Sequence, residues 1–138
     1  MERKLEMLKQ VPLFSGLNEE GLREVGRLAD EVNVPAGASL TKQGAFAHEF
    51  FLILEGSVSI DRNGMIVNHL GPGDFLGEIA LVDGGTRSAT AVTESPARLM
   101  VLGHREFNTL VDEFPEVRDG VFQALASRVR RLEPEGSH

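Results

Sequence analysis

The sequence predicts an α+β domain in which an antiparallel sandwich or barrel of short strands is flanked by helices. From about residue 31 to residue 103, short apolar runs alternate with glycine-bearing turns, a spacing typical of such all-β units. Before and after this region, apolar residues recur at helical spacing. The chain has 138 residues, of which 41% are hydrophobic, which suits one domain with its own core.

Two helices are predicted ahead of the strands. Leu5 and Leu8 lie at helical spacing within residues 1–10, and Pro12 ends that helix because proline cannot continue it. A second amphipathic helix is expected over about 19–29. Asn18 is its candidate N-cap, and the acidic residues that follow favour the positive end of the helix.

Five strands can be assigned from apolar runs and alternation, bounded by turn residues. They cover residues 50–54, 57–61, 65–70, 89–93 and 98–102. The Asn63-Gly64 dipeptide between the second and third is a strong signal for a tight hairpin, because both residues tolerate a positive φ.

A helix over 104–113 and a last helix started by Pro115 are predicted after the strands. Apolar residues of the last helix follow a 3-4-3 spacing: Phe122, Leu125, Val129 and Leu132. This stripe leaves two roles open, packing on the strands or pairing with a second copy of the helix. We therefore expect a single domain over 1–133, with helices in 1–30, strands in 31–103, helices in 104–133 and a tail at 134–138.

Composition excludes several classes of function. The absence of cysteine excludes disulfides, thiol catalysis, iron–sulfur clusters and zinc fingers. A net charge of −7 argues against nucleic-acid binding by this chain. The histidines are scattered without the spacing of metal ligands, so no metal site is expected. No apolar run approaches the ~18 residues of a membrane span, and we expect a cytoplasmic location.

The stretch from Phe75 to Thr90 carries the most specific chemistry. Glu78 and Arg87 lie nine residues apart, on either side of a short apolar turn. Gly77 has no Cβ, so a ligand could approach its backbone closely. Residues 79–82 are predicted to form one helical turn whose free N–H groups could hold an anion. Arg87 presents a planar fork that matches phosphate oxygens, and Glu78 could accept hydrogen bonds from a ribose. This combination suits a small ligand with a hydroxylated sugar and a phosphate.

The same stretch resembles the phosphate-binding cassette of the cyclic nucleotide-binding domain family. The matching residues are Leu76-Gly77-Glu78-Ile79-Ala80-Leu81 and, after a gap of five, Arg87-Ser88-Ala89. The resemblance covers about residues 10–132 and implies an antiparallel β-roll, that is, a jelly-roll-like double-stranded β-helix. Where this family often has Pro the chain has Thr86, and where it has acidic residues in an earlier turn the chain has Gln43 and Ala45.

The resemblance implies a role for each residue of the cassette. Arg87 would bind the cyclic phosphate together with the backbone N–H groups of Ile79 and Ala80 and the hydroxyl of Ser88. Glu78 would bind the ribose 2′-hydroxyl, and Gly77 would admit the ligand. The ligand would be a 3′,5′-cyclic nucleotide, with cyclic AMP favoured over cyclic GMP, and no cofactor or catalysis is expected.

The resemblance also implies a regulatory module of the kind found in bacterial regulators. Ligand binding would change the packing of the C-terminal helices, and an effector domain outside this chain would read that change. A homodimer through the 116–132 helix is one expected partner arrangement. The alternative is a structural or interaction β-roll of the same family that binds no cyclic nucleotide, or binds another small effector.

Overall fold

Two four-stranded antiparallel sheets form the body of the molecule. The computed structural model describes residues 2–11, 14–45, 49–77, 87, 89–120, 122 and 126. One sheet has the order β1-β8-β3-β6 and the other β2-β7-β4-β5. The strands of the first sheet are β1 (Asp30–Val34), β8 (Ala97–Gly103), β3 (Glu49–Glu55) and β6 (Phe75–Leu76). Those of the second are β2 (Ser39–Thr41), β7 (Thr90–Thr93), β4 (Val58–Arg62) and β5 (Met65–Leu70). The predicted β-roll is confirmed.

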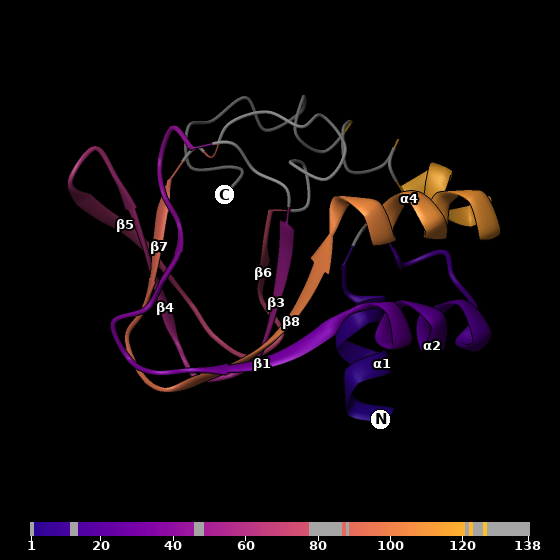
Figure 1. Ribbon diagram of the computed structural model, residues 1–138, viewed down its shortest axis with the longest axis horizontal. Coiled ribbons are helices and arrows are strands. Elements are labelled where there is room, and N and C mark those ends of the chain that lie inside the picture. The colour runs from indigo at the N-terminus through magenta and orange to yellow at the C-terminus, as the bar shows by residue number, and fades with distance from the viewer. Residues whose placement is uncertain are drawn as a thin grey trace.

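The helices gather at one end of the roll, beside the sheet that contains β3, while β5 lies at the opposite end (Figure 1). They are α1 (Glu2–Lys9), α2 (Glu19–Leu28) and α4 (His104–Glu113), and residues 116–120 are also helical. The Asn18 side chain accepts a hydrogen bond of 2.9 Å from the backbone N–H of Gly21, which confirms it as the N-cap of α2. Within the described residues, no helix is long and apolar enough to cross a bilayer.

Strand β3 divides the hydrophobic core into two clusters. Side chains of a strand point alternately to its two faces. Phe50 and Leu52 pack with the helices, whereas Phe51 and Ile53 pack inside the roll. All four are at most 5% exposed, so burial of each side chain contributes about 1.5–3 kcal/mol to folding. The face of β3 that carries Phe51 therefore looks into the roll.

An ion-pair network joins the N-terminal helix to the first sheet. The Glu31 carboxylate on β1 pairs with Lys4 of α1 and, at 2.9 Å, with Arg98 of β8. Arg98 also lies 4.0 Å from Glu55 at the end of β3. Because these groups are partly exposed, the network contributes modestly to stability.

The predicted hairpin turn forms between β4 and β5. Asn63 and Gly64 both have positive φ angles, 56° and 84°, as a two-residue hairpin of this type requires. Gln43 clamps the turn: its side-chain amide donates to Asn63 Oδ1, and its oxygen accepts from the Asn63 backbone N–H, each at 2.8 Å. Gln43 thus stabilises this turn through two hydrogen bonds of its side chain.

The structure adds strands that periodicity alone did not assign, β1, β2 and β6. Each is short or has an exposed, charged sequence such as Asp30-Glu31-Val32-Asn33-Val34, which carries little apolar signal. The last predicted helix is described only in part. Phe122 is 71% exposed, so this side chain does not pack on the roll. Leu125, Val129, Leu132 and the predicted tail lie outside the described residues, and the domain limits stay a prediction.

Candidate functional site

Arg87 is fixed by its main chain to the turn that precedes β3. Its backbone N–H donates to the carbonyl of Ala45 at 2.8 Å, and its carbonyl accepts from the N–H of Gly44 at 2.9 Å. Nearby, the Thr41 hydroxyl donates to the Ala89 carbonyl and accepts from the Ala91 N–H, both at 3.1 Å. These bonds hold the segment that carries Arg87 in register with β2.

The side chain of Arg87 turns inward and is 8% exposed. Its Nη2 donates a hydrogen bond to the backbone carbonyl of Glu49, the first residue of β3. Its Cζ lies 5.8 Å from the ring centroid of Phe51, within range of a cation–π contact. Nη1 is buried and has no hydrogen-bond partner among the described residues. Toward the residues that the structure describes, this buried cation therefore has unused donor capacity.

Burial sets the electrostatics of this cation. Loss of solvent lowers the pKa of the Arg87 guanidinium from its ordinary value, and the Glu49 charge opposes that effect. Arginine still remains protonated at any ordinary pH. A buried, charged donor without a partner is unfavourable in itself, and an anion that accepted from Nη1 would relieve that cost.

Gly77 makes room for the guanidinium. Its φ of 87° is one that residues with a side chain rarely adopt. A Cβ at this position would overlap Arg87 Nη1 and would lie 2.5 Å from the Glu49 carbonyl oxygen. We call the surface formed by Gly77, the Glu49 carbonyl and the Phe51 ring the arginine niche. A Cβ at residue 77 would therefore meet both the Arg87 guanidinium and the main chain of Glu49. That Gly77 also admits a ligand stays a prediction.

The structure thus brings two of the predicted site residues together, Gly77 and Arg87. The other four, Glu78, Ile79, Ala80 and Ser88, lie outside the described residues. Sequence reasoning missed the contributions of Glu49 and Phe51. A backbone carbonyl leaves no trace in a sequence, and Phe51 was expected only as part of a buried strand.

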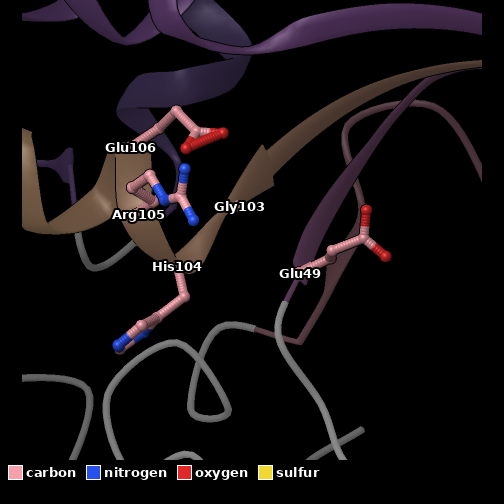
Figure 2. A pocket seen from close by; sticks show the side chains of 5 residues that line it. All are labelled: Glu49, Gly103, His104, Arg105 and Glu106. Atoms are coloured by element: carbon pink, nitrogen blue, oxygen red, sulfur yellow. The ribbon is translucent and has the colours of Figure 1, made fainter.

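A cavity of about 430 Å³ opens beside the niche, between the start of β3 and the start of α4. Figure 2 shows its lining residues, Glu49, Gly103, His104, Arg105 and Glu106. The carboxylate of Glu49 points away from the side chains of His104 and Arg105. Among the residues that the structure describes, no group of three or more His, Cys, Asp or Glu side chains could hold a metal ion.

The chain is similar to known proteins in both sequence and fold. The sequence model of a family described as "Cyclic nucleotide-binding domain" matches residues 31–114. A cyclic nucleotide-gated potassium channel of Mesorhizobium japonicum is 35% identical over 90% of this chain. The chain spans 34% of the length of that channel, about a third, so the match concerns one part of a larger protein.

Solved structures share the fold. The N-terminal domain of a transcriptional regulator from Streptomyces coelicolor superposes with a TM-score of 0.80 at 29% identity, covering 91% of this chain and 90% of that domain. The regulatory domain of Toxoplasma gondii PKA, solved with cAMP, superposes with a TM-score of 0.73 at 29% identity, covering 79% of this chain and 43% of that one.

Proposed function

Since the chain belongs to the cyclic nucleotide-binding domain family, we propose that it is a non-catalytic regulatory module that senses a 3′,5′-cyclic nucleotide. Cyclic AMP is favoured over cyclic GMP. The module acts in the cytoplasm, and the curated relatives, of which it spans about a third, suggest that its effector lies outside this chain.

The observation that carries the proposal is the unused Nη1 of Arg87. This nitrogen is buried and lacks a partner among the described residues, while Nη2 is held by the Glu49 carbonyl. A cyclic phosphate has two free oxygens that share one negative charge, and one of them could accept from Nη1. A hydrogen bond between two charged groups is stronger than one between neutral groups, so the phosphate would offset the desolvation of the guanidinium.

The remaining roles rest on the motif. Glu78 binds the ribose 2′-hydroxyl, the backbone N–H groups of Ile79 and Ala80 bind the phosphate, and Ser88 donates its hydroxyl to the same group. Gly77 acts through Arg87, by leaving the space that the guanidinium fills. The preference for cyclic AMP is supported by likeness to the regulatory domain solved with cAMP.

The decisive experiment is calorimetric titration of the purified chain with cyclic AMP, cyclic GMP and, as a negative ligand, 5′-AMP. Saturable binding of a cyclic nucleotide is expected, with cyclic AMP tighter. Arg87→Ala should weaken binding by at least about 2–5 kcal/mol, the usual cost of removing one partner of a buried charge pair.

Arg98→Ala is the matched control, because it removes the same charge from an arginine that is 48% exposed and belongs to the Glu31 ion pair. It should leave the affinity nearly unchanged. A folded chain that binds neither nucleotide would instead support an interaction β-roll or a different small effector.

We further propose that binding is transmitted through the C-terminal helices. A ligand shifts such an equilibrium only by binding one arrangement more tightly than the other. Hydrogen–deuterium exchange of α4 and residues 116–120, with and without cyclic AMP, tests this step. Unchanged protection in both segments at saturating ligand would refute it.

Pairing of two chains through the 116–132 helix is a separate proposal. It predicts a molar mass by light scattering that rises with the protein concentration.

A further inference from the structure

Glu49 occupies a face of β3 that its charge would not predict. Phe51 and Ile53, two and four residues further along the strand, pack inside the roll. Phe50 and Leu52 pack on the helix side. Because side chains alternate along a strand, Glu49 shares the roll-facing side with Phe51, the residue beneath the Arg87 guanidinium. Figure 2 agrees, since the Glu49 carboxylate points away from the side chains that begin α4.

The same residue meets Arg87 in two ways. Its backbone carbonyl accepts the hydrogen bond from Arg87 Nη2. Its exposed carboxylate acts on the guanidinium through space and favours the charged form. No ion pair within 4.0 Å joins the two side chains in the described part of the chain, so Arg87 Nη1 remains available.

We propose that the Glu49 carboxylate is a counter-charge for Arg87. It stabilises the Arg87 guanidinium when no ligand is bound, and it repels the anionic ligand that binds to that guanidinium. This inference rests on the proposed function and adds to it a residue that sets affinity. The backbone carbonyl of Glu49 helps to hold Arg87 in place, while the Glu49 carboxylate lowers the affinity of the site for its anionic ligand.

The Glu49 carboxylate is expected to raise the stability of the ligand-free chain but to lower its affinity for the ligand. These opposite effects distinguish the proposal from a purely structural role of Glu49. Glu49→Gln keeps the backbone carbonyl and the shape of the side chain but removes the charge. Cyclic AMP should bind the variant about two- to fivefold more tightly, the range for an exposed charge pair. The ligand-free variant should unfold at a lower urea concentration, because the buried guanidinium has lost its counter-charge. A residue that merely supported the fold would weaken binding when replaced.

Glu55→Gln is the matched control. It removes the same charge from the other end of β3, where the side chain is 63% exposed. Six residues of strand place it about 20 Å from Glu49, beyond a Debye length at physiological salt. Its affinity for cyclic AMP should equal that of the parent chain.

The test is calorimetric titration of the parent, Glu49→Gln and Glu55→Gln chains with cyclic AMP at 20 and 300 mM salt. The expected result is tighter binding for Glu49→Gln alone, with the gain reduced at high salt. Equal or weaker binding by Glu49→Gln at low salt overturns the proposal.

A parent chain that binds no cyclic nucleotide would refute the proposed function, yet the counter-charge can still be tested. Stabilisation against heat by inorganic pyrophosphate is then compared for the parent, Glu49→Gln and Arg87→Met chains. Greater stabilisation of Glu49→Gln, abolished in the double variant with Arg87→Met, supports the counter-charge. Equal stabilisation of all the chains, or none in any of them, overturns it.

Discussion

The guanidinium of Arg87 fills the space that a side chain at residue 77 would occupy. A Cβ on Gly77 would overlap Arg87 Nη1 and would lie 3.1 Å from Cζ. The two residues are ten positions apart in the sequence and belong to different segments. Gly77 directly follows β6, whereas the main chain of Arg87 is hydrogen-bonded to the turn at residues 44 and 45. The position of Arg87, the Glu49 carbonyl oxygen at 2.5 Å and the φ of 87° together require glycine at residue 77.

Gly77→Ala should destabilise the domain by at least about 2 kcal/mol. A positive φ costs an L-residue about 1–2 kcal/mol, and the overlap of the new Cβ with the Glu49 carbonyl oxygen and with Arg87 adds the strain of overpacking. Gly64→Ala separates the two terms, since Gly64 has a φ of 84° and nothing within 4 Å of an added Cβ. It should cost only the backbone term. Urea unfolding of both variants measures the difference, and equal losses would show that the overlap is relieved cheaply.

Arg87→Met should leave the ligand-free domain as stable as the parent, or up to about 1 kcal/mol more stable. The change replaces a desolvated cation by an apolar side chain of similar length, and such exchanges are often neutral or stabilising. Nucleotide binding should be lost at the same time. Chemical denaturation without ligand tests the first statement. A loss of more than about 2 kcal/mol would mean that the contacts with the Glu49 carbonyl and Phe51 outweigh the cost of desolvation.

The two hydrogen bonds between the Gln43 side chain and Asn63 can be removed one at a time by substitutions at residue 43. Gln43 both donates to and accepts from Asn63. Gln43→Glu retains an acceptor for the Asn63 N–H but cannot donate, whereas Gln43→Ala loses both bonds. Because a net hydrogen bond contributes about 0.5–1.5 kcal/mol, and less where it is exposed, stability should fall in the order Gln, Glu, Ala by about 1 kcal/mol in total. Thermal unfolding gives the order, and a Glu variant as unstable as Ala would contradict it.

The ion pairs of Glu31 should make the free energy of unfolding decrease in acid. Hydrogen bonding to Lys4 and the charges of Lys4 and Arg98 lower the pKa of Glu31 below its usual 4.5. Since the folded-state pKa is depressed, the stabilisation is present above pH 4.5 and is lost as pH falls through the folded value. Discounted for exposure, it amounts to about 0.5 kcal/mol. Glu31→Gln should therefore be less stable than the parent at pH 7 but equal to it at the acid end of a urea series, and a gap that persists in acid would refute the assignment.

The sequence carried much of the fold because the signals were local. Asn18 caps α2, the Asn63-Gly64 pair turns the β4–β5 hairpin, and the predicted limits of β5 and α4 agree with the structure. Strands β1 and β6 depend on pairing with the distant strands β8 and β3, and their own residues show little of the apolar pattern that predicts a strand.

The candidate site was predictable as a set of residue types but not as an arrangement. Arg87 could be chosen from its motif, and so could Gly77. That Arg87 is held by the carbonyl of a residue 38 positions away follows only from the fold. The same holds for Glu49, whose orientation depends on which face of β3 looks into the roll.

The arginine niche is built largely from main-chain atoms, and this affects how the site can change in evolution. A carbonyl oxygen is supplied by any amino acid, so residue 49 can be exchanged without loss of the contact that orients Arg87. The position is free to vary in charge while the architecture stays constant. Closely similar domains could therefore be adapted to different cellular concentrations of their ligand by changing a single surface residue, without rebuilding the pocket.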